Sequence, residues 1–326
     1  MNRSVILALG LAALFAASLM IGPRGMAGWA DLAALFLAEP PTDAGGIVVR
    51  DLRLPRGLAA LLAGGALGAA GVVIQTLSRN PLADPGLLGV NSGAAFAIVA
   101  AIVVFGPLAP QDRVVPAIAG ASAAAALIWL LAGRAPAPMT LILAGVALSA
   151  LLGAGVRTLI LIDQTALDGF RRWTVGSVAQ PEPGALWIAA LLAALAGGLT
   201  ALSVRRLDAL ALGDDTARAL GVSMAATKTL ALATTALLSA AAVLVAGPLL
   251  FVGLIAPHIA RRVAGAASTG ALAVHAMLCG AGLVLLADMI GRSLFRGLVV
   301  EAGLGIVIVG GPMLILLVRR DARDRS

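Results

Sequence analysis

The residues best placed to recognise a charged partner are arginines beside long apolar runs. Arg53 and Arg56 stand three residues apart in the sequence Arg-Leu-Pro-Arg, immediately before such a run. Guanidinium groups at this spacing can form bidentate pairs with carboxylates of a partner on the outside of a membrane. The alternative is that they are ordinary flanking arginines that extend to a membrane interface. Arg292 is a further candidate, although its i, i+4 spacing from Asp288 also allows these two side chains to neutralise each other on one helix face.

Polar and helix-breaking residues mark the end of the apolar run that follows Arg56. Gln75 lies about one helical turn before that end, where a buried amide needs a hydrogen-bond partner and so ties helices together. Asn80, Pro81 and Pro85 follow, and they end a helix and force a non-helical turn. We therefore predict a structural or gating role for this stretch, with a lining role for Gln75 as the alternative.

A second proline-interrupted stretch contains Gly247, Pro257 and His258. A histidine within an apolar segment could serve in a proton relay or as a ligand, but no carboxylate lies near His258 in the sequence. A structural hydrogen bond is therefore the favoured interpretation for His258. Gly247 and Pro257 are predicted to shape or gate the same stretch, because glycine and proline interrupt a helix.

The longest polar interval between apolar runs extends from Arg205 to Lys228. Within it, Asp214 or Asp215 can cap the N-terminus of a short helix, and Gly221 can end that helix. A short exposed helix with Ala and Leu on one side suits docking into a groove of a partner, whereas the alternative is a plain connector. The residues that we assign to this candidate contact are Leu212, Gly213, Asp214, Asp215, Arg218, Ala219, Leu220 and Gly221.

The elements that must position these residues are membrane helices. Of 326 residues, 60% are hydrophobic and only 12% are charged, with a mean hydropathy of +1.03. Soluble domains carry roughly 25% charged residues, so this composition excludes a soluble enzyme, a disordered chain and a nucleic-acid binder. The net charge of +7 is distributed in short clusters between long apolar runs, which is typical of a polytopic helical membrane protein in a lipid bilayer. A single cysteine, Cys279, offers neither a disulfide nor a metal cluster, and we expect no metal, no cofactor and no catalytic residue.

Apolar runs of the length needed to span a bilayer predict ten helices. The charge-free runs are 4–23, 57–78, 85–111, 114–133, 135–156, 183–204, 229–260, 263–287 and 302–318. We divide 229–260 at Gly247-Pro248, because it is too long for one span and proline there breaks the helix. An even number of spans places both termini on one side, and thirteen of 23 Lys and Arg residues then lie on that side, which favours cytoplasmic termini.

The two proline-interrupted stretches also indicate a weak internal duplication. Each follows a long Gly/Ala-rich run, with Pro81 and Pro85 in the first half and Pro248 and Pro257 in the second. In the ten-helix arrangement the first stretch lies inside and the second outside. This is the pattern expected of halves with inverted topology.

Taken together, these motifs resemble the FecCD family, the permease subunits of bacterial ATP-binding-cassette importers for iron–siderophore complexes, haem and cobalamin. The similarity extends over about residues 30 to 320, and segment 82–94 is most similar to the ferric-enterobactin-type permeases of the family. The matching segments, in family order, are 53–56, Gln75 with 79–85, 212–221, 247–261, 287–292 and 310–312. Two segments depart from the family pattern, Ala266-Ala267-Ser268-Thr269 and Glu301-Ala302.

The resemblance implies an all-α fold of ten transmembrane helices, of the type II ABC importer class, as a single permease domain over 1–326 in the bacterial cytoplasmic membrane. It implies that residues 207–224 form the coupling loop touched by an ABC ATPase subunit, which hydrolyses ATP in place of this chain. It also implies a second permease subunit, and a substrate-binding protein whose acidic residues meet Arg53, Arg56 and Arg292.

The implied cargo is a ferric siderophore, with haem or cobalamin as the alternative within the family. We expect the path for this cargo to be lined mostly by small apolar residues, because no run of charges crosses the membrane. The main rival from another class is an ion-coupled secondary transporter. Such a transporter would need carboxylates inside the membrane, and the middles of the predicted helices contain neither Asp nor Glu.

Overall fold

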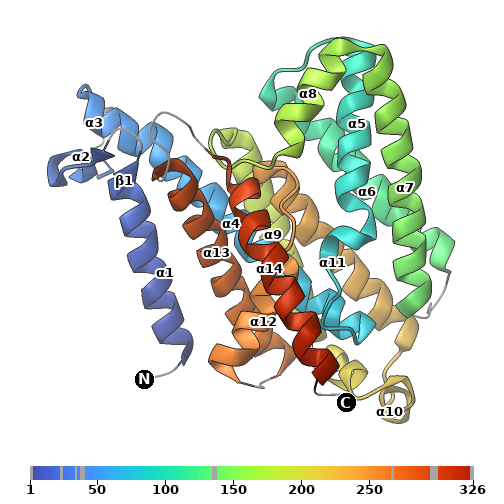
Figure 1. The fold of residues 1–326 in the computed structure, drawn as a ribbon. Coiled ribbons are helices and arrows are strands. Elements are labelled where there is room, and N and C mark those ends of the chain that lie inside the picture. Colours follow the sequence, from blue (N-terminus) through green and yellow to red (C-terminus); the bar gives the residue numbers. More distant parts are fainter. Residues whose placement is uncertain are drawn as a thin grey trace.

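The computed structural model shows a bundle of long helices with short helices at both ends (Figure 1). It describes residues 3–22, 25–33, 35–36, 41–133, 138–265, 268–293 and 300–323. The long helices are α1 (Arg3–Met20), α4 (Leu54–Ser78), α5 (Val90–Phe105), α6 (Val114–Ala132), α7 (Pro138–Ile162), α9 (Pro183–Ala211), α11 (Met224–Ala246), α12 (Val252–Ala264), α13 (Thr269–Ser293) and α14 (Ala302–Arg323).

Short elements connect these helices. They are the antiparallel pair β1 (Ile21–Gly22) and β2 (Gly25–Met26), the helices α2 (Trp29–Ala33), α3 (Ala44–Ile47), α8 (Gln164–Thr174) and α10 (Asp214–Ala219), the π-helical turn η1 (Val48–Arg53), and the 3-10 turns η2 (Pro85–Leu88) and η3 (Pro110–Arg113).

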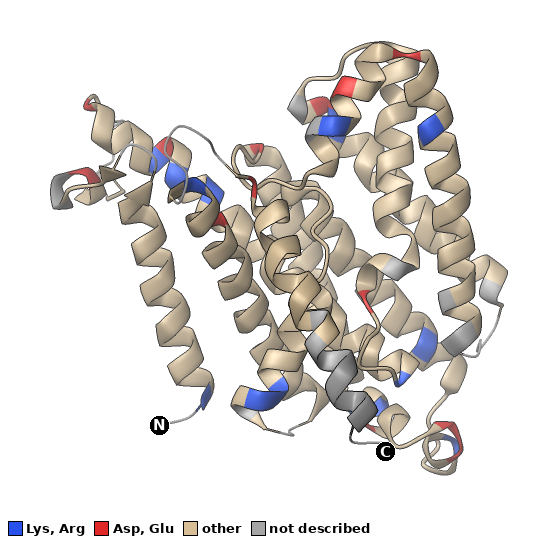
Figure 2. Cartoon of the chain, in the orientation of Figure 1, with Lys and Arg blue, Asp and Glu red and all other residues tan. Residues whose placement is uncertain are grey.

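Each of the ten predicted apolar runs contains one of the long helices. Among the described residues, seven helices are long and apolar enough to cross a membrane, and Val90–Phe105 and Ala302–Met313 are shorter apolar helices. The helical membrane architecture is therefore confirmed, whereas ten complete spans stay a prediction. Figure 2 shows most of the charged residues near the two ends of the bundle, with long uncharged stretches of helix between them.

Helix boundaries differ from the predicted runs where polar residues continue a helix. The helix that contains α4 begins at Ala44 instead of residue 57, because α3, η1 and α4 are continuous and Asp43 caps their start by accepting a hydrogen bond from the Gly46 amide at 2.7 Å. Similarly, α9 continues past the charged residues at its end to Ala211, so residues 207–211 of the predicted coupling loop are helical.

Glycines allow α4 to occupy the centre of the bundle, where it packs against α9, α11, α12 and α13. A Cβ atom at Gly64 or Gly68 would overlap the backbone of α13, at Gly280 and Ala276 respectively, and a Cβ at Gly71 would overlap Gly253 of α12. Small residues thus let these backbones approach closely, as predicted from the glycine and alanine content.

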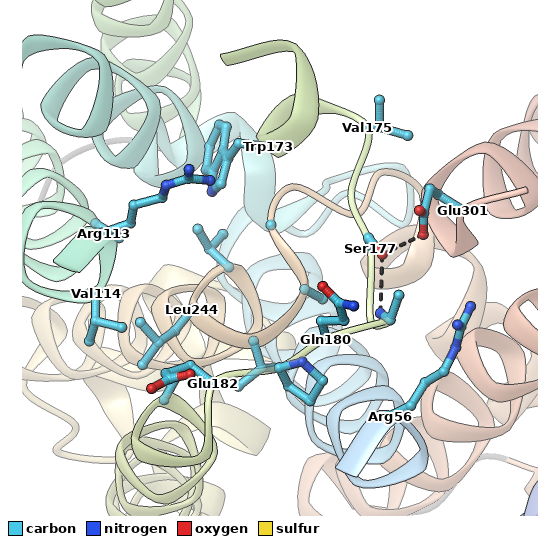
Figure 3. A pocket seen from close by; sticks show the side chains of 18 of the residues that line it. Arg56, Arg113, Val114, Trp173, Val175, Ser177, Gln180, Glu182, Leu244 and Glu301 are labelled. Carbon is cyan, nitrogen blue, oxygen red and sulfur yellow. Dashed lines mark hydrogen bonds between the residues drawn. The ribbon is translucent and has the colours of Figure 1, made fainter. Parts of the chain in front are cut away.

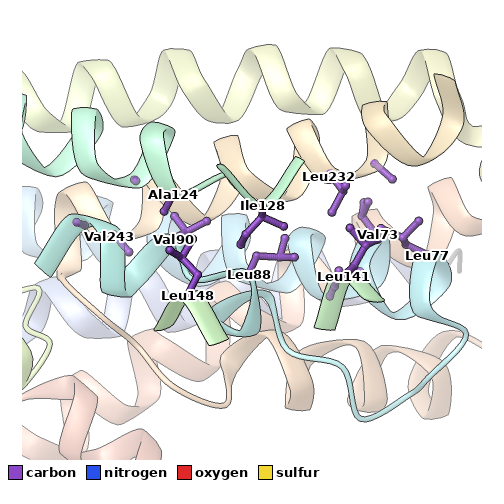
Figure 4. Packing of buried hydrophobic residues seen from close by; sticks show 14 of the residues in the cluster. Val73, Leu77, Leu88, Val90, Ala124, Ile128, Leu141, Leu148, Leu232 and Val243 are labelled. Atoms are coloured by element: carbon purple, nitrogen blue, oxygen red, sulfur yellow. The ribbon is translucent and has the colours of Figure 1, made fainter. Parts of the chain in front are cut away.

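Two buried hydrophobic clusters lie on either side of α4. The first joins α5, α6 and α7 to one part of α4 and α11, and Figure 4 shows Leu88, Val90, Ile128, Leu148 and Val243 within it. The second joins the other part of α4 and α11 to α9, α13 and α14. Because α4 and α11 contribute to both clusters, they connect the two parts of the molecule.

The proline-interrupted stretches meet inside the bundle. The predicted break at Gly247-Pro248 is present, because α11 ends at Ala246 and Gly247 has φ 66°. Pro85, at the start of η2, lies so close to Gly253 of α12 that a Cβ atom on that glycine would overlap it. The expectation that one stretch lies inside and the other outside stays a prediction, and α12 brings part of the second stretch against the first.

Candidate functional sites

Arg53 at the end of η1, Arg56 in the first turn of α4 and Arg292 near the end of α13 lie close together, and Arg56 and Arg292 flank the carboxylate of Asp288. These element ends lie at the end of the bundle opposite α10 (Figure 1). The Arg56 Nε atom donates to Asp288 Oδ1 at 2.8 Å and to Oδ2 at 3.0 Å. The Arg292 Nε atom lies 3.4 Å from Asp288 Oδ2, which confirms the pairing predicted from the i, i+4 spacing. One carboxylate therefore holds two guanidinium groups.

Backbone carbonyl groups hold the rest of this arginine cluster. Arg53 Nη1 donates to the carbonyls of Leu19 and Met20 at 2.9 and 2.6 Å, and Arg292 Nη2 donates to Ser18 O at 2.7 Å. Arg53 is 6% exposed and Arg292 is 3% exposed. The three arginines thus fix the end of α1 against α4 and α13 within this chain. Their contact with a binding protein stays a prediction.

The predicted short helix between α9 and α11 is present as α10, but its cap differs from the prediction. Gly213, at φ 113°, occupies the N-cap position, so neither Asp214 nor Asp215 caps the helix. Gly221 follows the helix at φ 76°, in the left-handed region, as expected of a residue that ends a helix. Leu212 and Leu220 are 67% and 62% exposed, so the helix presents apolar side chains away from the bundle.

Asp214 anchors α10 to two long helices. Its Oδ1 atom accepts from Arg79 Nη2 at 2.7 Å, and its Oδ2 atom accepts from Lys228 Nζ at 3.0 Å. Partial burial raises the pKa of this carboxyl, but the hydrogen bond from Lys228 and the charges of Lys228, Arg79 and Arg218 outweigh it, so the pKa lies below its ordinary value. Asp215, by contrast, has a fully exposed side chain that pairs with Arg218 at 2.9 Å.

Gln75 ties three segments together, as predicted. Its Nε2 atom donates to the carbonyls of Ala83 and Gly253, at 3.3 Å each, and its Oε1 atom accepts from Arg261 Nη1 at 3.0 Å. Asn80 supports the same turn by accepting a hydrogen bond from the Leu82 amide at 2.9 Å. The amide of Gln75 thereby satisfies the Gly253 carbonyl, which Pro257 leaves without a helical donor, and the Ala83 carbonyl in the turn after α4.

The second stretch contributes to packing. Pro257 lies inside α12 against Gly71 of α4, and His258 follows it, half-buried. Gly247 faces the backbone of Trp173, near the end of α8, and of Gly176, which follows α8. Close backbone approach therefore explains Gly247 and Pro257, while the structural hydrogen bond at His258 stays a prediction.

A cavity of about 1000 Å³ opens at the same end of the bundle as the arginine cluster. It lies between the α5, α6 and α8 side and the ends of α4, α11 and α13 (Figure 3). Its lining includes the buried apolar residues Ile98, Ala117 and Val243. Its charged lining residues are Arg53, Arg56, Arg113, Arg171, Arg292, Glu182 and Glu301. The mostly apolar path for the cargo stays a prediction.

Sequence reasoning missed the residues that the fold brings to this cavity. Glu301 appeared only as a departure from the family pattern, yet it accepts a hydrogen bond from Ser177 and so holds the segment before α9 against the start of α14 (Figure 3). Arg113 and Trp173 come from separate elements and form no local motif. The other departure spans residues 266–269, of which 266 and 267 lie outside the described residues. Thr269 begins α13, and its amide donates to Asp208 Oδ1 at 2.7 Å.

Comparison with known proteins defines the class of this molecule. Residues 10–320 match the FecCD transport family. The chain is 40% identical over 313 residues to the ferric enterobactin transport system permease protein FepD of Escherichia coli, which covers 94% of this chain and 92% of the relative. It is 38% identical over 282 residues to the hemin transport system permease protein HmuU of Yersinia pestis, covering 85% of this chain and 84% of the relative.

A solved structure supports the same class. It is an inward-facing conformation of a metal-chelate type ABC transporter, with a TM-score of 0.82 and 31% identity, and the match covers 97% of this chain and 98% of that chain. A multi-pass helical protein of this fold is a membrane transport permease. The chain belongs to the FecCD transport family, and the resemblance drawn from its motifs is confirmed.

Proposed function

We propose that this chain is the permease subunit of an ATP-driven importer that moves a ferric siderophore across the bacterial cytoplasmic membrane. The observation that carries the proposal is its 40% identity, over 94% of its length, to a ferric enterobactin permease. The anchored helix α10 adds a physical reason for this proposal. A permease that does not hydrolyse ATP itself must be coupled to the ATPase subunit through a direct contact.

Within this proposal, α10 and its flanks, in the segment 207–224, form the contact with the ABC ATPase subunit. The exposed side chains of Leu212 and Leu220 supply apolar surface, and Arg218 supplies charge. Asp214 passes a displacement of α10 to α4 through Arg79 and to α11 through Lys228. Since α4 and α11 join both hydrophobic clusters, a movement there can change how the two parts of the bundle pack.

The opposite end of the bundle is proposed to receive the substrate-binding protein. The three arginines Arg53, Arg56 and Arg292 face two carboxylates, Asp288 and Asp31, which leaves a positive excess in the cluster. Acidic residues of the binding protein would be attracted to that excess. With α10 in the cytoplasm, this end is outside, and both termini are cytoplasmic if ten helices span the membrane.

The complete importer is proposed to contain a second permease subunit, which pairs with this chain to enclose the path of the cargo. Each permease subunit is proposed to be a single domain whose two halves are inverted repeats. A haem chelate is the second candidate cargo, because the hemin permease relative is 38% identical. An ion-coupled mechanism is disfavoured, since the middles of the predicted spans contain no Asp or Glu.

The test is reconstitution of this chain with its ATPase subunit, its permease partner and a binding protein in proteoliposomes. We expect uptake of radiolabelled ferric siderophore to require ATP, and uptake of haem to be slower. Uptake that proceeds without ATP under a proton gradient would contradict the proposal, and preferred uptake of haem would favour the second candidate.

A further inference from the structure

We propose that Asp208, near the end of α9, is a positioning residue that links the proposed ATPase contact to α13. Through this link, α13 joins the segment 207–224 at one end of the bundle to the arginine cluster at the other end. This inference rests on the proposed function and extends it to a residue outside α10.

Asp208 caps α13 from a different helix. Its Oδ1 atom accepts a hydrogen bond from the Thr269 amide at 2.7 Å, although the two residues are 61 positions apart. Thr269 is the first residue of α13, and the first amide groups of a helix have no partner within that helix. A carboxylate satisfies such an amide, and its negative charge is favourable at the N-terminal end of the helix dipole. A side chain of α9 therefore fixes the start of α13.

The α13 helix also has a local cap. The Ser268 hydroxyl accepts a hydrogen bond from the Ala271 amide at 3.3 Å, which satisfies another amide of the first turn. The hydrogen bond to Asp208 is thus an additional contact between two helices. We infer that its main effect is to fix where α13 begins relative to α9.

The two helices are also closely packed at this point. A Cβ atom at Gly270 would lie 2.8 Å from Cγ2 of Val204 and 3.3 Å from its Cγ1. Val204 and Asp208 are spaced i, i+4, so they lie on the same face of α9. This face holds two successive residues of α13, Thr269 through a hydrogen bond and Gly270 through packing. The end of α9 and the start of α13 should therefore move together.

Asp208 lies within the segment proposed to contact the ATPase subunit. The α9 helix ends three residues later, at Ala211, and α10 begins at Asp214. Backbone hydrogen bonds from the amides of Leu212 and Gly213 to the last turn of α9 close the short turn between the two helices. A displacement of α10 is thus passed to Asp208 over a few residues. Asp214 links α10 to α4 and α11, and Asp208 adds a link to a further long helix.

The α13 helix can transmit a displacement across the bundle. It has 25 residues, which gives a length of about 37 Å at 1.5 Å per residue. No proline interrupts it, whereas α12 and α14 contain Pro257 and Pro312. Near its other end, Asp288 pairs with Arg56 and with Arg292. A shift at the start of α13 would therefore reach the residues proposed to meet the binding protein.

Such a link makes the two ends of the permease depend on each other. If nucleotide on the ATPase subunit changes the affinity of the importer for its binding protein, then the binding protein changes the affinity for nucleotide by the same factor. This factor is the ratio of the dissociation constants of the binding protein with and without nucleotide. Loss of the contact between Asp208 and Thr269 should bring the ratio closer to one and leave both binding events in place.

The experiment uses the assembled importer in lipid nanodiscs and its own substrate-binding protein, labelled with a fluorophore. The dissociation constant of the binding protein is measured with and without a non-hydrolysable ATP analogue. We expect the ratio of the two constants to fall about fivefold in Asp208→Ala. It should stay near the wild-type value in Asp208→Asn, because asparagine also accepts a hydrogen bond from a helix amide.

Asp163→Ala is the matched control. The Asp163 carboxylate caps α8 by accepting a hydrogen bond from the Ala166 amide at 2.9 Å. The same substitution therefore removes a cap from a helix outside the proposed link, and the ratio should not change.

A second pair of variants tests the packing contact. Gly270→Ala places a methyl group against Val204 and should lower the ratio. Val204→Ala combined with Gly270→Ala removes the two methyl carbons that the new Cβ would meet, so the double variant should recover the ratio. A general loss of stability would not be reversed by a second truncation.

A wild-type ratio of one would overturn the proposal, as would an unchanged ratio in Asp208→Ala. Equal losses in Asp208→Ala and Asp163→Ala would also overturn it, because removal of any helix cap would then suffice. If Asp208→Ala does not assemble, the Gly270 variants decide, and an unchanged ratio in Gly270→Ala or no recovery in the double variant would contradict the link. ATP-driven uptake by the wild type tests the proposed function separately, so the two failures can be told apart.

Discussion

Asp214 of α10 accepts a hydrogen bond from Arg79 at the end of α4, with 2.7 Å between Oδ1 and Nη2. The two residues are 135 positions apart in the chain. Arg79 has φ 50°, a left-handed conformation that directs the chain out of α4 into the Pro81–Pro85 turn. The same residue that ends the central helix thus holds the helix proposed to contact the ATPase.

Removal of the Asp214 charge should uncouple transport from ATP hydrolysis. In Asp214→Asn, α10 loses its ion pairs to Arg79 and Lys228, and we expect the number of substrates moved per ATP hydrolysed to fall about tenfold. The ATPase subunit should still bind, because Leu212 and Leu220 are unchanged. The measurement is uptake and phosphate release in the same proteoliposomes.

The variant Asp112→Asn is the control for this prediction. Asp112 is an exposed acidic residue of η3, outside the segment 207–224, so the ratio of uptake to hydrolysis should stay near that of the wild type. An equal loss of coupling in both variants would argue against Asp214 as the anchor. Because the pKa of Asp214 is lowered, its ion pairs persist at neutral pH and are lost only as the pH falls through that lowered pKa.

The exposed leucines of the loop are expected to carry the affinity for the ATPase. In Leu220→Ser, the apolar surface that α10 presents is reduced, and we expect retention of the ATPase subunit in a pull-down to fall several-fold, by roughly 1–2 kcal/mol of binding free energy. Leu202→Ser, at a leucine of α9 that is more exposed than Leu220, controls for a general loss of apolar surface. Full retention of the ATPase by the Leu220 variant would count against this contact.

Asp288 should be essential for stability at the end of the bundle opposite α10. In Asp288→Asn, Arg56 and Arg292 would remain almost buried without a carboxylate, and removal of one partner from a buried ion pair costs roughly 3–5 kcal/mol. We expect a large drop in the midpoint of thermal unfolding of the purified protein. Asp51→Asn, on the exposed side of η1, should leave that midpoint unchanged. Similar midpoints for the two variants would refute the role of Asp288.

Substitution of the small residues at the centre of the bundle should also lower the stability of the protein. A Cβ at Gly68 would overlap the backbone of α13, so Gly68→Ala should destabilise the protein by about 1–3 kcal/mol. Gly10→Ala in α1 is the matched control, because nothing lies within 4 Å of a Cβ at that position. Thermal unfolding of both variants in the same detergent would measure the difference, and equal midpoints would show that α4 and α13 are less tightly packed than described.

The side-chain pairs that could be predicted from the sequence are those between residues close together in the chain. Asp288 and Arg292 were paired correctly because their i, i+4 spacing fixes them on one helix face. The Arg56–Asp288 pair, 232 positions apart, left no local pattern, and neither did the hydrogen bond from Arg261 to Gln75. The cap of α10 was misassigned because Gly213 can adopt a backbone conformation that frees Asp214 to reach other helices.

The same distinction between local and long-range interactions applies to the helices. Long apolar runs predicted the long helices, since a helix is the only single-segment structure that satisfies its backbone in lipid. The contact of Pro85 with Gly253 and the cavity lined by Arg113, Trp173 and Glu301 depend on how these helices pack, which a single sequence does not specify.

The central claim is that this permease moves a ferric chelate with the energy of ATP hydrolysed by another subunit. The most direct measurement is uptake of radiolabelled ferric siderophore into proteoliposomes that contain the assembled importer, with either an active or a catalytically inactive ATPase subunit. The account predicts ATP-dependent uptake with the active subunit and none with the inactive one. Equal uptake with both subunits, driven by an ion gradient alone, would contradict it.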